Sequence, residues 1–188
     1  MLALQHSSHK HKIPMETRDT SVLKKEPPAW YRWTVLVFIS LAMFGNYYIY
    51  DSISPLADVL VRQLHFSDSD IGLLQGIYSV PNIIMVLIGG FIIDRLGTRK
   101  STLLFAVLCL LGSAVTAFSS TLALMATGRL IFGLGAESLI VAVTTAIAKW
   151  FKGKEMALAM GLQLALARLG TATALIVIPR IVNIEQSY

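Results

Sequence analysis

The sequence predicts an all-α membrane protein that crosses the bilayer five times, and three observations support this fold class. Hydrophobic residues make up 55% of the chain and charged residues only 14%, whereas soluble domains carry about 25% charged residues. Uncharged or nearly uncharged stretches of at least ~18 residues recur along the chain, close to the length that a helix needs to cross the hydrocarbon layer. The charges fall in short clusters between these stretches, so each cluster marks a junction between two spans.

Residues 1–29 precede the first span and are polar with mixed charge, a composition typical of a disordered tail. Histidines are spaced closely near the start of this tail, at His6, His9 and His11. They could bind a metal ion, but we interpret them as solvated and predict no metal site. No signal peptide is recognisable, because the first apolar stretch begins too far along the chain and is too long.

The first span is expected at 33–62, where an uncharged run that opens with interface aromatic residues continues as an amphipathic segment beyond Asp51. The sequence Ser67-Asp-Ser-Asp70 predicts a capping box that opens the second span, 70–94. Small residues in this second span favour close packing against other helices in lipid. They include Gly72, Gly76, Gly89 and Gly90.

Three further spans are expected at 101–118, 122–148 and 155–179, and the remaining residues, 181–188, are too few for another crossing. We therefore expect the chain to be a fragment or a truncated product. Lysine and arginine concentrate in the tail and in the second and fourth junctions, which predicts that the N-terminus and these junctions are cytoplasmic and that 181–188 lie on the opposite side. The net charge of +5 does not indicate nucleic-acid binding, because the basic residues fall in junctions and not on one face.

The second junction carries a family signature. It reads Gly90-Phe-Ile-Ile-Asp-Arg-Leu-Gly-Thr-Arg-Lys100 and resembles the G-x-x-x-D-R-x-G-[RK]-[RK] loop of the major facilitator superfamily, except that Thr98 replaces a basic residue. The matching positions are Gly90, Asp94, Arg95, Gly97 and Arg99. The resemblance implies that the carboxylate engages the other half of the transporter and stabilises one conformation. Alternatively, the loop's cations serve only to hold the junction in the cytoplasm.

A second resemblance covers residues 128–170, from Gly128-Arg-Leu-Ile-Phe-Gly-Leu-Gly135 to Arg168-Leu-Gly170. It is similar to the branch of the superfamily that contains lysosomal dipeptide transporters. The resemblance implies the first five helices of a twelve-helix fold, built from two six-helix halves of inverted repeats. The sixth helix and the C-terminal half would then be partners outside this chain. It further implies secondary active or facilitative transport of short peptides, in the lysosomal membrane of a eukaryote or the inner cell membrane of a prokaryote.

Three ionisable residues interrupt the apolar spans: Arg129, Glu137 and Arg168. Each such group at the bilayer centre costs roughly 2.5–3.5 kcal/mol on insertion scales and so needs a partner or a water-filled cavity. The expected span limits place Glu137 and Arg168 within roughly 4 Å of the same depth. They could form a permanent ion pair or share a zwitterionic peptide, with its carboxylate on the arginine fork. We favour a switch, in which the two pair when empty and part when substrate binds.

Arg129 could face the same cavity or extend toward the outer interface. Asp51, which follows the aromatic cluster of Tyr47, Tyr48 and Tyr50, could line the outer half of the cavity or lie at the interface. An organic-anion or sugar carrier, with Arg129 and Arg168 both facing the solute, is an alternative, as is a non-transporting membrane subunit. An accessory membrane subunit is a further possible partner. No nucleophile, phosphate-binding loop or cofactor motif is recognisable, so neither an enzyme nor a bound cofactor is predicted.

Overall fold

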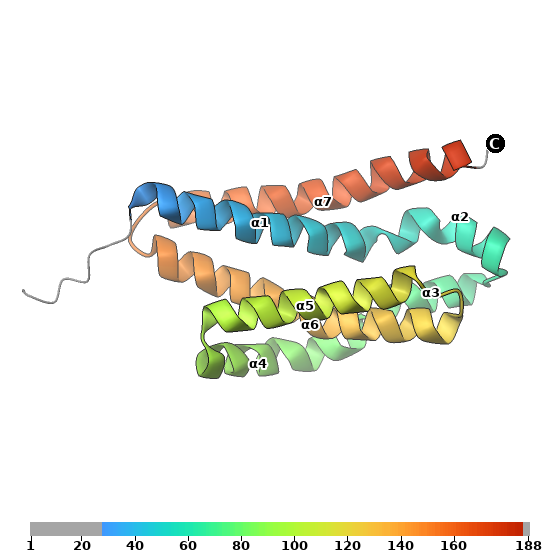
Figure 1. Cartoon of the computed structure of the whole chain (residues 1–188), viewed down its shortest axis with the longest axis horizontal. Helices are drawn as coiled ribbons and strands as arrows, with labels where there is room; N and C mark the ends of the chain where they lie inside the picture. Colours follow the sequence, from blue (N-terminus) through green and yellow to red (C-terminus); the bar gives the residue numbers. More distant parts are fainter. Residues whose placement is uncertain (1–27, 186–188) are drawn as a thin grey trace, which may run out of the picture.

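Seven α-helices and no β-strand make up residues 28–185, the part of the chain that the computed structural model describes (Figure 1). The helices are α1 (Ala29–Asp51), α2 (Ile53–Leu64), α3 (Asp68–Gly76), α4 (Ser79–Leu96), α5 (Thr98–Ala117), α6 (Leu122–Phe151) and α7 (Met156–Glu185). They form five segments that are long and apolar enough to cross a membrane: Ala29–Leu64, Asp68–Leu96, Thr98–Ala117, Leu122–Phe151 and Met156–Val182. The predicted all-α membrane fold is confirmed.

Two of the five spans are each made of two helices. In the first span Ser52 separates α1 from α2, and in the second span Ile77 and Tyr78 separate α3 from α4. A proline stands in the first turn of each following helix, Pro55 in α2 and Pro81 in α4. Proline has no N–H to donate to the carbonyl four residues earlier and its ring crowds that carbonyl, which explains why each helix is interrupted there. The break in the second span was not predicted.

The first and last helices begin and end at residues other than those predicted. α7 continues through Pro179 to Glu185, beyond the predicted end of the fifth span at 179. At the other end, helix α1 has begun by Ala29. The rest of the predicted tail, with its three histidines, lies outside the described residues, as do residues 186–188.

The turn between the first two spans contains the predicted capping box, which is confirmed. The backbone N–H of Asp70 donates to Ser67 Oγ at 3.3 Å. In return the Asp70 carboxylate accepts the backbone N–H of Ser67 at 2.9 Å. This exchange satisfies N–H groups that have no partner within the helix, so α3 begins at a fixed residue and the α2–α3 connection is short.

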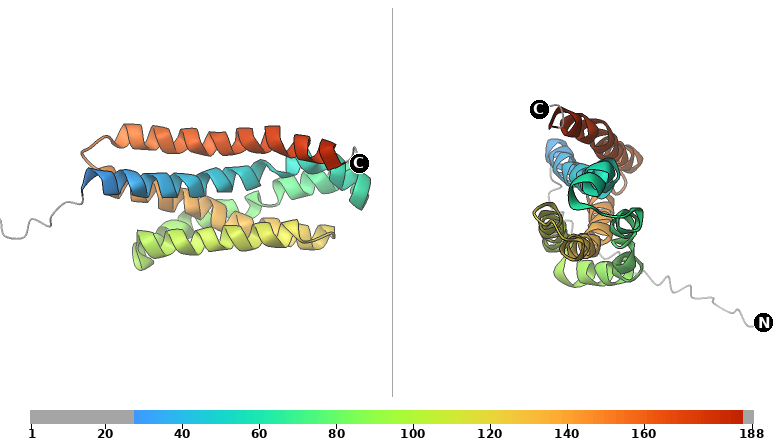
Figure 2. Two further views of the ribbon diagram at one scale, coloured as in Figure 1. Left: turned by 45° about the horizontal axis from the view of Figure 1, so that its top comes forward. Right: turned by 90° about the vertical axis from the view of Figure 1, so that its right-hand side faces the viewer.

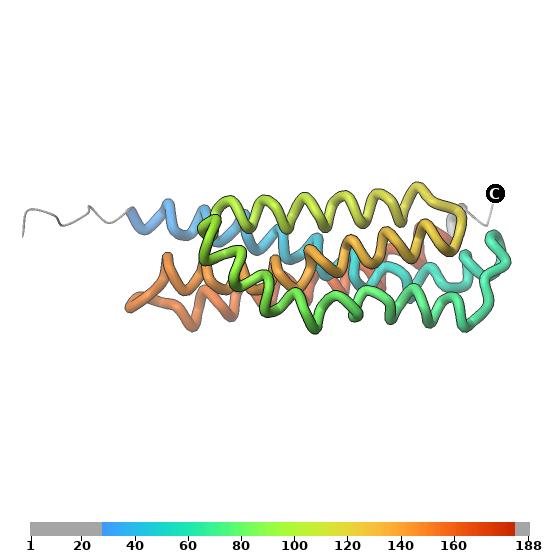
Figure 3. The backbone as a smooth tube through the Cα atoms, turned by 90° about the horizontal axis from the view of Figure 1, so that it is seen from below, coloured from blue at the N-terminus to red at the C-terminus, as the bar shows by residue number. Residues whose placement is uncertain are grey.

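Helix α6 is the centre of the bundle. It packs against α5 on one side and α4 on another, while α1 pairs with α7 (Figures 1 and 2). In the most apolar 18-residue stretch of α6, 56% of residues are buried, against 22% in each of the other four spans. Figure 3 follows the chain as it runs back and forth along this bundle. Residues on α6 therefore reach several other helices at once.

Candidate functional site

A cavity of about 300 Å³ lies between α1, α6 and α7 and reaches the start of α4. Four of the five residues predicted to bind substrate line it: Tyr47, Asp51, Glu137 and Arg168. Its wall is completed by Asn46, Tyr50, Tyr78, Ala136, Ile140 and Thr171. The structure thus brings one guanidinium, two carboxylates and three tyrosines together around one space in the middle of the bundle.

Glu137 and Arg168 face this cavity without pairing with each other. Glu137 Oε1 accepts a hydrogen bond from Asn82 Nδ2 on α4 at 3.1 Å, and the Arg168 guanidinium lies 5.4 Å from the centre of the Tyr47 ring. A salt bridge joins Arg32 to Glu155 at 3.9 Å, whereas none within 4.0 Å joins Glu137 to Arg168. The conformer that the structure contains therefore lacks the permanent ion pair between these two residues.

Asp51 links the end of α1 to α7. Its Oδ2 accepts a hydrogen bond from Thr171 Oγ1 at 2.6 Å. Beside it, the hydroxyls of Tyr50 and Tyr78 are in hydrogen-bond contact, and their rings meet edge to face at 4.7 Å between centroids. A hydrogen bond to a charged acceptor contributes about 1.5–3 kcal/mol, so Thr171 holds the Asp51 carboxylate in one orientation at the cavity wall.

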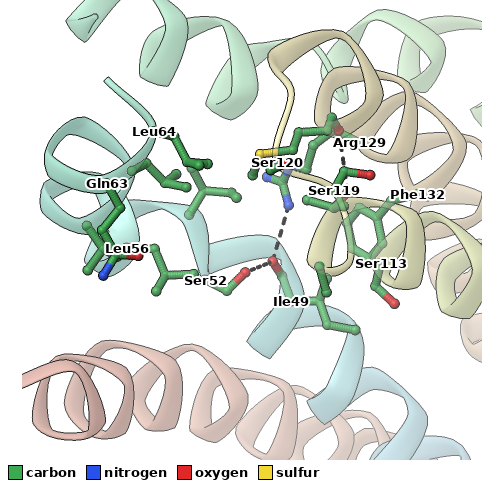
Figure 4. A pocket seen from close by; sticks show the side chains of 16 residues that line it. Ile49, Ser52, Leu56, Gln63, Leu64, Ser113, Ser119, Ser120, Arg129 and Phe132 are labelled. Atoms are coloured by element: carbon green, nitrogen blue, oxygen red, sulfur yellow. Dashed lines mark hydrogen bonds between the residues drawn. The ribbon is translucent and has the colours of Figure 1, made fainter. Parts of the chain in front are cut away.

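Arg129 does not line this cavity and does not extend toward an end of its helix. Its side chain is buried, with 2% exposure, and donates to three backbone carbonyls: Nε to Leu74 at 3.1 Å, Nη1 to Ile49 at 3.2 Å and Nη2 to Tyr50 at 3.1 Å. It borders two neighbouring cavities, one of about 370 Å³ (Figure 4) and one of about 260 Å³. All three nitrogen atoms of the guanidinium group thus donate to carbonyls near the ends of two other helices.

The signature loop forms the tight junction between α4 and α5. Gly97 has φ 79° and ψ 155°, a backbone region that only glycine adopts readily, which explains the glycine at this position. The Arg95 guanidinium lies 4.3 Å from the centre of the Phe91 ring. Asp94 is exposed and, within the described part of the chain, makes no hydrogen bond or salt bridge. The space beside Gly90 is also open, because an added Cβ there would meet nothing within 4 Å.

Sequence reasoning did not identify three residues of the cavity region: Asn82, Tyr78 and Thr171. A signal existed for the first, because Asn82 is a polar amide inside an otherwise apolar span. Thr171 stands three residues after Arg168 and therefore on the same helix face. Tyr78 could not be selected, because its position depends on the unforeseen break between α3 and α4.

Comparison with known proteins gives one family and several relatives. The family model of the Major Facilitator Superfamily matches residues 8–184. The chain is 38% identical over 152 residues to the lysosomal dipeptide transporter MFSD1 of Danio rerio, covering 79% of this chain and 33% of that protein. It is 39% identical over 145 residues to that of Homo sapiens, covering 75% and 31%. A galacturonate transporter of Dickeya chrysanthemi is 29% identical over 130 residues, covering 69% and 38%. The chain thus spans about a third of the length of the curated relatives it matches.

Proposed function

Because the chain belongs to the Major Facilitator Superfamily, we propose that it supplies the first five helices of a transporter that carries short zwitterionic peptides across a membrane. The observation that carries this proposal is the cavity between α1, α6 and α7, in which Glu137 and Arg168 face the same space while each contacts a neutral group. Relatives named as dipeptide transporters support the substrate class.

The cavity offers complementary charges to the two ends of a peptide. The ammonium group binds Glu137, whose carboxylate is oriented by Asn82. The carboxylate binds Arg168, because the planar guanidinium fork accepts a carboxylate through two parallel hydrogen bonds. Tyr47 and Asp51 complete the wall near the helix break. In this conformer the two charges are separated, so they do not have to be pulled apart when substrate binds, which lowers the free energy that binding must supply.

Transport requires a second half that rocks against this one around the cavity. The exposed carboxylate of Asp94 at the α4–α5 junction is the contact that we assign to the C-terminal half in one of the two conformations. The concentration of lysine and arginine at that end of the bundle supports a cytoplasmic N-terminus. The membrane is lysosomal in a eukaryotic cell and the inner cell membrane in a prokaryote.

A second candidate substrate is a sugar acid, which the similarity to a galacturonate transporter favours. In that case Arg168 would bind the single carboxylate of the solute. Arg129 cannot serve as the second cation of such a site in this conformer, because its guanidinium donates to three backbone carbonyls. The two carboxylates of the cavity would then lack an ammonium partner, so the peptide is the better chemical match.

The test is uptake of a labelled dipeptide into liposomes that contain the complete protein that includes this chain. Glu137→Gln and Arg168→Gln each remove one charge from the cavity, and we expect kcat/KM to fall about 10- to 100-fold, the equivalent of one charge-assisted hydrogen bond. Asp58→Asn and Arg62→Gln remove the same charges at exposed positions outside the cavity and should retain uptake. Protease protection of the membrane-inserted form shows that each variant is correctly assembled.

Competition and gradients decide the remaining alternatives. Excess unlabelled dipeptide should block uptake and galacturonate should not, whereas the reverse result would assign the cavity to a sugar acid. Dependence of uptake on a pH gradient would make the protein a proton symporter, and independence would make it a uniporter. If the wild type inserts but transports neither solute, the proposal is wrong and a non-transporting membrane subunit remains.

A further inference from the structure

The two helix breaks lie next to each other. The Tyr50 ring, at the end of α1, meets the Tyr78 ring, at the start of α4, with 4.7 Å between centroids, and their hydroxyls are in contact. The segment between the breaks is the hairpin α2–α3, Ile53–Gly76. Both ends of this hairpin therefore meet the rest of the bundle at one place, which is the geometry of a hinged segment.

Arg129 joins the same two breaks from α6. Its carbonyl acceptors are Ile49 and Tyr50 near the end of α1 and Leu74 near the end of α3. Carbonyls in the last turn of a helix carry partial negative charge, and Ile49 O here also accepts from the Ser52 N–H and hydroxyl. One buried guanidinium thus binds the ends of two helices at once.

The hairpin shares a small core with the start of α6. Ile53, Leu60, Phe66, Ile71 and Leu74 form a cluster with Met125 and Ala126 at the start of α6, separate from the main cluster of the bundle. Between α2 and the facing parts of α5 and α6 lies the cavity of about 370 Å³ (Figure 4). Close-packed interiors do not yield gradually, so this space is where the hairpin can shift without compressing its neighbours.

We propose that the α2–α3 hairpin moves as one segment, hinged at Ser52 and at Ile77–Tyr78, and that Arg129 is the positioning residue that holds it beside the substrate cavity. The hinge borders that cavity directly, because Tyr50, Asp51 and Tyr78 line both it and the 260 Å³ cavity next to Arg129. Movement of the hairpin therefore changes the wall of the substrate cavity. The transport part of the test rests on the proposed function, whereas the distance part does not.

The first measurement is the distance between spin labels in the complete protein, in a Cys109→Ala background. One pair, Arg62→Cys with Ser120→Cys, spans the 370 Å³ cavity between α2 and the α5–α6 turn. The other pair, Asp58→Cys with Ser69→Cys, lies within the hairpin. All four sites are exposed. Arg129→Gln should broaden the distance distribution of the first pair and leave that of the second unchanged. Loss of even one of the three charge-assisted bonds of Arg129 shifts such an equilibrium about 10- to 100-fold.

Three results would overturn the proposal. An unchanged distribution for the first pair would show that Arg129 does not hold the hairpin, and equal broadening of both pairs would show that the hairpin is not one segment. If Arg129→Gln fails to insert, Tyr78→Phe replaces it, because it removes only the hydroxyl contact with Tyr50. We expect this variant to broaden the first pair less strongly, and no broadening at all would reject the proposal.

Uptake kinetics separate positioning from substrate contact. Arg129→Lys keeps the charge but cannot present the planar fork to carbonyls of two helices, so we expect kcat to fall while KM for the dipeptide stays within about twofold. A rise in KM with kcat unchanged would make Arg129 a substrate ligand and overturn the assignment. If the wild type transports no dipeptide, the proposed function fails, but the spin-label distances still decide whether Arg129 holds the hairpin.

Discussion

Substituting Gly112 by alanine should separate α5 from α6. A Cβ at this position would lie 2.7 Å from both the carbonyl oxygen of Gly128 and the Cα of Phe132, and closer still to the Phe132 backbone nitrogen. Ordinary Cβ contacts begin at about 3.4 Å, so the two helices would have to move apart by at least about 0.7 Å. The obstructing atoms belong to the backbone and cannot rotate away.

We expect Gly112→Ala to destabilise the protein by about 1–3 kcal/mol, the range for overpacked cores. The higher helix propensity of alanine than of glycine offsets roughly 0.5–1 kcal/mol of this loss. Gly161→Ala is the matched control, because a Cβ there meets nothing within 4 Å. The assay is the midpoint of unfolding of the complete protein in detergent, followed by the fluorescence of a fused reporter. If both variants unfold at the wild-type midpoint, the closeness of α5 and α6 in the structure is wrong.

Three further substitutions test other local features. Gly97→Ala forces alanine into a glycine-only backbone region and should cost about 1–3 kcal/mol of stability; unfolding no easier than that of Gly161→Ala would contradict the strained junction. Ser67→Ala removes the cap of α3 and should lower the free energy of unfolding by about 1 kcal/mol. Ser69→Ala, two residues further along the chain, should have no such effect. Thr171→Val removes the hydrogen bond to Asp51 and should raise KM for dipeptide about threefold to tenfold. Thr173→Val, whose hydroxyl bonds only to Leu169 O of its own helix, should leave KM unchanged.

Sequence patterns predicted those features of the fold that depend on residues close together in the chain. The spans follow from apolar length, and the capping box of Ser67 and Asp70 follows from two residues three positions apart. The glycines were less predictable. Four glycines of the second span were expected to pack closely, and Gly89 does, because a Cβ there would lie 2.6 Å from Ser138 Oγ. A Cβ at Gly72, Gly76 or Gly90 would meet nothing within 4 Å, whereas Gly112, Gly128 and Gly135 are in tight contact. Which glycine faces another helix depends on how each helix is rotated, and composition does not contain that information.

The candidate site shows the same division. Depth along the helices predicted correctly that Glu137 and Arg168 could face one space, because rise per residue is a local property. Their actual contacts could not be predicted, since Asn82 and Tyr47 reach them from other helices. The carbonyl acceptors of Arg129 could not be predicted either, because they lie where two spans are interrupted.

The order of the chain bears on how α6 enters the bilayer. A charged residue at the middle of an isolated span opposes insertion by roughly 2.5–3.5 kcal/mol, and α6 carries Glu137 near its middle and Arg129 closer to its start. The carbonyls that receive Arg129, on Ile49, Tyr50 and Leu74, and the amide of Asn82 that meets Glu137, all precede α6 in the chain. Each charge therefore finds its polar partner already synthesised when the fourth span leaves the ribosome. Biogenesis of this bundle can therefore proceed from the N-terminus, with the earlier spans supplying the polar partners of the span that carries Arg129 and Glu137.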